Sequence, residues 1–176
     1  MDWEITSNGT GDVERMLRKA LHIAAEVQTR GLPRCGVIAR RTAKEYAPRS
    51  PTMKQLSATL KRKRRTSHRT HPGGLEKSIE FEVKGDSCAV FVPENAYCVS
   101  VSRKTGKRFN YAKRIHDEKG VTWHNRGPGT IAKGAQADEK FIERAITDKG
   151  DTFREIFDDE LGSAIARTCG TFEGDF

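Results

Sequence analysis

The sequence has no long apolar run. None of its segments approaches the roughly 20 consecutive apolar residues that a helix needs to cross a bilayer. The N-terminus, MDWEITSNGTGDVE, is acidic and lacks the apolar segment of a secretory signal. Hydrophobic residues make up 35% of the 176 positions and charged residues 32%. We therefore expect a soluble protein with a modest core that folds in a cytoplasm and has no membrane partner.

Cysteine is scarce, and the four cysteines are scattered along the chain. No pair has the C-x-x-C spacing of a zinc or redox site. Because a free thiol packs like a small apolar side chain, we expect small buried thiols. They are Cys35, Cys88, Cys98 and Cys169.

The common signatures of catalysis and nucleotide binding are also missing. The chain has no G-x-S-x-G motif. Gly106-Lys107 has neither the upstream glycine nor the following Ser/Thr of a phosphate-binding P-loop. The Gly/Pro segment RGPGT is not a dinucleotide fingerprint.

Two groups of titratable residues remain as alternatives. His68 and His71 have a spacing that could ligate a metal, but the neighbouring positive charges would repel a cation. His116, Asp117 and His124 could serve acid–base chemistry, for example in a nuclease, or could be solvated side chains near a helix end. We favour the second interpretation and predict no enzyme activity, no metal and no cofactor.

Apolar residues recur at helical spacing from about residue 11 to residue 30, which predicts an amphipathic helix. Gly31 and Pro33 in the following segment RGLPRCG are expected to end or kink it. A weaker stripe over 37–46 can resume the helix before Pro48.

The middle of the chain changes to the period of a strand. Alternation in SIEFEV (78–83) predicts a half-buried strand, and Gly85-Asp86 the turn to a partner strand that ends at Pro93. A third strand is expected over 97–102, followed by a hairpin with Thr105-Gly106 at its apex. YAKRIHD reads as a short helix, and VTW as a further short strand.

The C-terminal part returns to helical spacing from 138 to about 167, with Gly150 inside, and predicts one long helix. The fold class is therefore α+β. It comprises an N-terminal amphipathic helix, an antiparallel β-meander of three to four strands and a long C-terminal helix packed on the sheet. We expect a single domain over residues 1–170, with a basic arm inserted at about 48–74 and a C-terminal tail over 171–176.

Charge is distributed unevenly along this basic chain, whose net charge is +8. Residues 30–77 hold fourteen Lys and Arg and two acids, whereas 138–160 hold nine acids and four Lys and Arg. The densest basic segment, 61–69, has six Lys and Arg beside His68. Such asymmetry indicates a polyanionic partner, or self-association between a basic and an acidic surface.

These two alternatives define candidate residues. The basic candidates, which could contact a partner subunit or DNA, are Lys61, Arg62, Lys63, Arg64, Arg65, Arg69, Arg103, Lys104, Lys107 and Arg108. The candidate acidic partner surface consists of Glu143, Glu155, Asp158, Asp159 and Glu160. Nonspecific nucleic-acid binding by 61–69 stays open, although no aromatic residue lies in that segment to stack on bases.

Four short motifs follow one another along the chain in an order that resembles the order in a known family. They are Ala47-Pro48, Gly74-Leu75-Glu76-Lys77-Ser78-Ile79, Tyr111-Ala112-Lys113-Arg114-Ile115-His116 and Lys140-Phe141-Ile142-Glu143-Arg144-Ala145. Together they resemble the neck or tail-completion proteins of tailed bacteriophages, a family of head–tail joining and minor tail proteins. The resemblance extends from about residue 12 to residue 165.

The resemblance implies a structural virion protein, made in the host cytoplasm and located in the head–tail neck. Such proteins form rings, commonly of six copies, between the portal or connector and the tail terminator or tail tube, and DNA passes through the ring. The implied partners are thus other copies of the chain, adjoining neck proteins and the DNA in the channel. On this interpretation the segment 61–69 is an assembly arm that orders when the ring forms.

Overall fold

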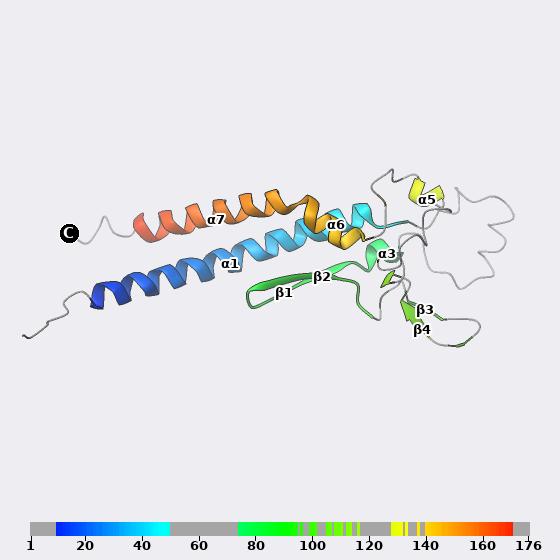
Figure 1. Cartoon of the computed structure of the whole chain (residues 1–176), viewed down its shortest axis with the longest axis horizontal. Coiled ribbons are helices and arrows are strands. Elements are labelled where there is room, and N and C mark those ends of the chain that lie inside the picture. Colours follow the sequence, from blue (N-terminus) through cyan, green and yellow to red (C-terminus); the bar gives the residue numbers. More distant parts are fainter. Residues whose placement is uncertain are drawn as a thin grey trace, which may run out of the picture.

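The structure is a computed structural model with a long N-terminal helix, a set of short elements and two C-terminal helices (Figure 1). Its elements are α1 (Thr10–Tyr46), α3 (Gly74–Lys77), β1 (Glu80–Lys84), β2 (Ser87–Phe91), β3 (Val99–Val101), β4 (Arg108–Asn110), α5 (Pro128–Ile131), α6 (Phe141–Asp148) and α7 (Gly150–Gly170). The residues that it describes are 10–49, 74–94, 96, 99–101, 105–106, 108–110, 112–113, 116, 128–131, 133, 137 and 140–170.

Helix α1 continues through the segment that was predicted to end it. Pro33 lies inside the helix, although a proline removes one main-chain donor. The neighbouring glycines face close contacts: a Cβ at Gly31 would lie 2.8 Å from Cε1 of Phe157, and one at Gly36 would overlap the ring of Phe81. Of the two predicted alternatives, an end of the helix here is wrong, because packing on two sides outweighs one lost hydrogen bond, and a kink stays a prediction.

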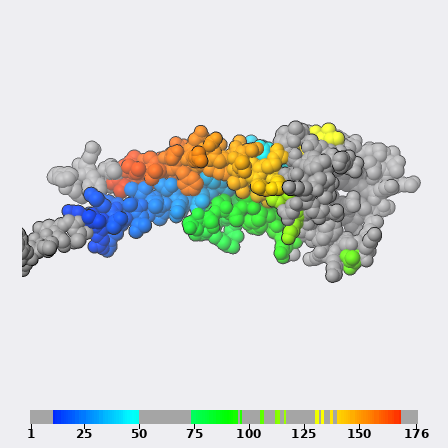
Figure 2. All heavy atoms as spheres, viewed as in Figure 1, coloured from blue at the N-terminus to red at the C-terminus, as the bar shows by residue number. Residues whose placement is uncertain are grey.

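Helix α1 is the central element, and at 1.5 Å per residue its 37 residues span about 55 Å. Helices α6 and α7 pack along one side of it, and the β1–β2 hairpin packs along another (Figures 1 and 2). The sequence predicted that the C-terminal helix packs on the sheet. Instead α6 and α7 pack on α1, and α1 in turn contacts the hairpin.

The described strands form two separate antiparallel pairs, β1–β2 and β3–β4. Phe81 pairs with Val90 in the first, and Ser100 with Phe109 in the second. Both predicted turns are confirmed, and a glycine takes the left-handed conformation in each, at Gly85 (φ +58°) and Gly106 (φ +64°). The predicted single meander of three to four strands is not formed by the described residues.

The predicted single C-terminal helix is interrupted at Lys149. Its amide donates to the carbonyl of Ile146, 3.3 Å away, so the last turn of α6 is tightened. Helix α7 then restarts, with the amide of Phe153 donating to the carbonyl of Lys149 at 2.9 Å. The helical phase is nearly kept, which explains why the sequence pattern looked continuous.

The apolar core lies at the C-terminal end of α1. Phe141 and Ile79 are its largest fully buried side chains. Small residues fill most of the remaining space, so the helices approach closely but bury little area per residue. The cluster consists of Ala43, Ala47, Leu75, Ile79, Ala112, Phe141 and Ala145.

The coarse prediction of a mixed helix-and-sheet fold is confirmed: a long N-terminal helix, antiparallel strands and a C-terminal helix are present. Within the described residues, no helix combines the length and the apolar character needed to span a bilayer. The division into one domain with an inserted arm stays a prediction.

Candidate functional site

Most of the basic candidates lie outside the described residues. They are Lys61, Arg62, Lys63, Arg64, Arg65 and Arg69 of the predicted arm, and Arg103, Lys104 and Lys107 of the predicted hairpin tip. Arg108 belongs to β4, and only its main chain is described. The structure does describe residues on either side of the predicted arm, such as Arg49 and Glu76.

The two ends of the predicted arm are held together. Arg49 precedes the segment 50–73, and its Nε lies 3.6 Å from Oε2 of Glu76, which follows the segment. The hydroxyl of Thr130 donates to the carbonyl of Arg49 and accepts from its amide, both at 3.2 Å. The described residues on either side of the segment 50–73 therefore lie close together.

Lys133 strengthens this place and was missed by the sequence analysis. Its Nζ donates to the carbonyls of Lys44 at 2.6 Å and Ala47 at 3.0 Å, and lies 3.2 Å from Oε1 of Glu76. A cation at the end of α1 is favourable because the last carbonyls of a helix are otherwise unsatisfied. Burial, opposed by Glu76, lowers the pKa of Lys133. A single lysine in a Gly- and Ala-rich segment gives no pattern that could have predicted this contact.

Three of the five acidic candidates form an exposed face on α7. Glu155, Asp158 and Asp159 are exposed, and the two aspartates lie three and four residues after Glu155, about one helix turn. Among the described residues, none of the three forms an ion pair. Arg154, which precedes Glu155, pairs instead with Asp151 at 3.8 Å. This face carries negative charge that the described part of the chain leaves available to a partner.

The other two acidic candidates are engaged within the chain. Glu160 is largely buried, and its Oε1 lies 2.6 Å from Nη1 of Arg34 on α1. Glu143 is exposed and pairs with Lys140 at 2.9 Å. Glu160 therefore fixes α7 against α1, and the residue that it pairs with lies 126 positions away, beyond the reach of a local pattern.

Opposite charges are concentrated on different helices. Helix α1 has eight Lys and Arg and four acids, whereas α7 has five acids and two Lys and Arg. Two ion pairs join the helices: Arg34 to Glu160, and Arg167 to Glu26 at 2.9 Å. The remaining acids of α7 are exposed, and so are Arg30 and Arg41 of α1. Arg40 is instead half-buried, and its Nε donates to the carbonyl of Ile79 at 3.2 Å.

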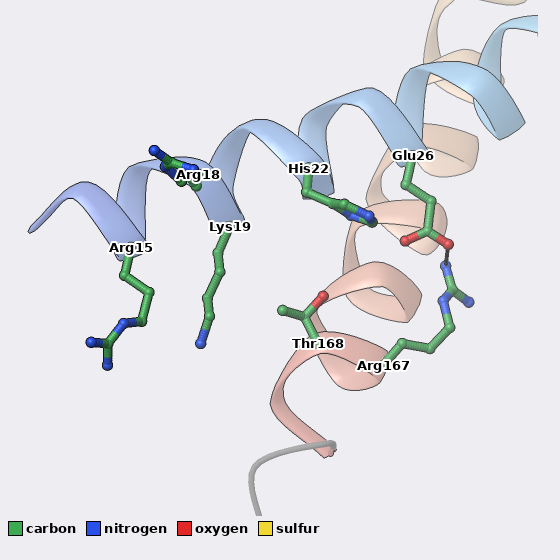
Figure 3. A pocket seen from close by; sticks show the side chains of 7 residues that line it. All are labelled: Arg15, Arg18, Lys19, His22, Glu26, Arg167 and Thr168. Atoms are coloured by element: carbon green, nitrogen blue, oxygen red, sulfur yellow. Dashed lines mark ion pairs between the residues drawn. The ribbon is translucent and has the colours of Figure 1, made fainter. Parts of the chain in front are cut away.

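A shallow basic hollow of about 460 Å³ lies between the start of α1 and the end of α7 (Figure 3). Arg15 and Lys19 extend from α1 on the same side as Thr168 and Arg167 of α7. The sequence analysis did not single out this group, although three cations within residues 15–19 indicate it. The described residues that line it are Arg15, Arg18, Lys19, His22, Glu26, Arg167 and Thr168.

The acid–base alternative is only partly described, and His68 and His71 of the metal alternative lie outside the described residues. The ring of His116 packs edge-on against Phe141, 5.3 Å between centroids, and its carbonyl accepts from the amide of Lys140 at 3.3 Å. His116 therefore contributes to the wall of the core, while Asp117 and His124 lie outside the described residues. Among the residues that the structure places, no group of three or more His, Cys, Asp and Glu is arranged for a metal.

Two cysteines can be placed. Cys35 is buried and Cys88 is half-buried, and both are free thiols. Burial raises the pKa of each thiol, so both are poor nucleophiles. The prediction of small buried thiols is confirmed for Cys35, while the side chains of Cys98 and Cys169 lie outside the described part.

Comparison of the chain with protein-family models, curated proteins and solved structures finds no match.

Proposed function

We propose that this chain is a structural protein of a tailed-phage virion, whose copies form a ring in the head–tail neck. The ring joins the portal or connector to the tail and surrounds the DNA channel. The observation that carries the proposal is the separation of charge: an exposed acidic face on α7, and basic residues concentrated on α1 and in the segment 61–69. Identical subunits with two opposite surfaces can join head to tail, and such contacts close into a ring when the rotation permits.

The residues behind the family resemblance support a shared architecture. Ala47 begins the first motif, Leu75 and Ile79 belong to the second, Ala112 to the third and Phe141 to the fourth, and all five are core residues. Each motif therefore contributes at least one side chain to the core. The assembly role depends on the surfaces, which must be tested separately.

The principal test of the proposal removes the charge of the arm. In the variant with Lys61, Arg62, Lys63, Arg64 and Arg65 all replaced by serine, we expect a folded monomer that fails to complete particles. Circular dichroism measures folding, and electron microscopy of particles from a complementation assay measures the neck. Normal, infectious particles from this variant would show that the arm has no part in assembly.

A second candidate function is nonspecific binding of nucleic acid. The basic hollow at the α1–α7 end favours it, together with the segment 61–69, because clustered cations bind phosphate by releasing counterions. A gel-shift titration of the purified monomer at low and at physiological salt separates the two functions. Tight binding that falls steeply with salt supports the nucleic-acid function, and negligible binding at physiological salt supports the neck function.

A further inference from the structure

The start of α1 exposes an apolar stripe. The exposed fractions are 56% for Val13, 70% for Met16, 60% for Leu17 and 71% for Leu21. Their spacing of three and four residues places them along one side of the helix. We call residues 13–21 the α1 tip.

The tip is far from the core of the chain. The core cluster surrounds Ala43 and Ala47 at the other end of α1. The last turns of α7 lie beside Arg15–Glu26, and the first turns of α1 project past them (Figures 1 and 3). A helix end that packs on so little is marginally stable alone, and a stripe of four large apolar side chains indicates a contact with another surface.

The outward side of α7 has a matching arrangement. Leu161 and Ile165 are 42% and 44% exposed and lie one helix turn apart, as Leu17 and Leu21 do. Asp158 lies three residues before Leu161, so its carboxylate borders the apolar pair. We call the set Glu155, Asp158, Asp159, Leu161 and Ile165 the outer α7 surface.

Charges at the tip are opposite to those of the outer α7 surface. Arg18 lies three residues before Leu21, in the position that Asp158 has relative to Leu161. Arg18 pairs with Glu14 at 2.5 Å, and Arg15 with Asp12 at 3.7 Å, but both pairs are exposed. Exposed pairs of this kind contribute little, so a partner acid can compete for either arginine.

From this complementarity we propose that the α1 tip of one copy docks on the outer α7 surface of the next copy. Leu17 and Leu21 cover Leu161 and Ile165, and Arg18 faces Asp158. The contact joins two different surfaces, so it propagates from copy to copy and can close into a ring. The inference rests on the proposed neck function and names the surfaces that build its ring.

A second copy fits this stripe better than a lipid surface does. A membrane would cover the apolar stripe of α1 but would repel the acidic residues beside Leu161 and Ile165, and it would leave that exposed pair unexplained. The chain itself offers an acidic surface with an apolar pair of the same spacing. One helix crossing buries less area than a standard interface, so we expect a weak contact that ring closure reinforces.

The test uses two double variants of the full chain. The tip variant is Leu17→Gln/Leu21→Gln, and the surface variant is Leu161→Gln/Ile165→Gln. Glutamine keeps helix propensity while removing the apolar contact. The matched control is Val37→Gln, which changes a 55% exposed apolar residue of α1 outside both surfaces. Sedimentation velocity measures the mass of each protein from about 1 μM to about 1 mM, the range for a contact of this size.

We expect the wild type and the control to gain mass with concentration, and each double variant to stay monomeric. An equimolar mixture of the two double variants should form a 1:1 dimer and nothing larger, because one intact tip meets one intact α7 surface. Circular dichroism confirms that both variants are folded.

Three outcomes overturn the proposal. A monomeric wild type at all concentrations shows that the surfaces do not bind each other. Association by the surface variant but not by the tip variant shows a symmetric tip–tip contact. Association by both variants shows that the copies associate through another part of the chain. The neck function is judged separately, by whether the chain is found at the head–tail junction of particles.

Discussion

Of the described glycines, Gly36 is the one at which an added Cβ would meet the closest atoms. A Cβ added there would overlap the ring of Phe81 and lie 2.8 Å from Sγ of Cys88. Gly162, on the outward side of α7, has no atom within 4 Å of its Cβ position. Substituting alanine at each glycine therefore measures two different effects. At Gly36 it measures the cost of overpacking, and at Gly162 the gain in helix propensity.

We expect Gly36→Ala to destabilise the fold by about 1 to 3 kcal/mol, because a methyl group forces the hairpin away from α1. Gly162→Ala should stabilise it by about 0.5 to 1 kcal/mol, since alanine has the lower unfolded-state entropy. Urea unfolding followed by circular dichroism measures both. An unfolding midpoint of Gly36→Ala equal to that of wild type would contradict the close packing at this site.

Lys133 gives the second prediction at this scale. Lys133→Met keeps the apolar stem but leaves the carbonyls of Lys44 and Ala47 without their donor. The expected loss of unfolding free energy is about 1 to 3 kcal/mol, the cost of stranding buried acceptors. A control is Lys113→Met, which changes an exposed lysine and should alter stability by no more than about 0.5 kcal/mol.

The same variant gives a pH dependence. Because burial lowers the pKa of Lys133, the unfolded chain binds more protons than the folded chain just below the ordinary value of 10.5. The contribution of Lys133 to stability therefore rises as the pH rises towards 10.5. The difference in unfolding free energy between wild type and Lys133→Met should be larger at alkaline pH than at neutral pH. A difference that shrinks with rising pH contradicts the burial of the amine.

At the scale of elements, the pairing of α1 with α7 depends on contacts that local patterns do not contain. Strand β1 was predictable because Phe81 and Val83 alternate with charged residues, and the tight turn was predictable from Gly85. Gly31 reads locally as a helix breaker. The residue that it packs against, Phe157, lies 126 positions later, so a local pattern does not contain this contact. Long-range packing therefore reversed a local propensity.

The candidate site divides in the same way. Segregation of charge along the chain predicted an acidic partner surface, and two of its residues, Asp158 and Asp159, are exposed. Glu160 could not be distinguished from them by sequence, since its role depends on which way α7 faces α1. Tertiary orientation decides which member of an acidic run pairs internally and which remains exposed.

The Arg34–Glu160 pair allows a test of how α7 is held. Arg34 is half-exposed while Glu160 is largely buried, so solvent weakens the pair and we expect a coupling of about 1 kcal/mol. A double-mutant cycle with Arg34→Gln and Glu160→Gln measures the coupling. It should diminish in 1 M NaCl because salt screens exposed charges. Zero coupling at low salt would show that the pair does not fix α7.

At the scale of the whole molecule, the chain is polarised in two respects. Its core cluster lies at one end of α1, and four large apolar side chains, Val13, Met16, Leu17 and Leu21, are exposed at the other. Basic residues dominate α1 and acidic residues dominate α7. In the ring that we propose, each copy supplies the surface that covers the exposed end of the previous copy.

Reversal of one charge pair tests this polarity without changing the apolar residues. Arg18→Glu and Asp158→Arg each place like charges in contact between copies, so each single variant should associate about tenfold more weakly at low salt. The double variant Arg18→Glu/Asp158→Arg restores opposite charges between neighbours and should recover most of the lost affinity. Sedimentation velocity at two salt concentrations measures the effect. Because identical copies carry both changes, recovery occurs only if residue 18 of one copy meets residue 158 of the next, and additive losses in the double variant would place the two residues in separate contacts.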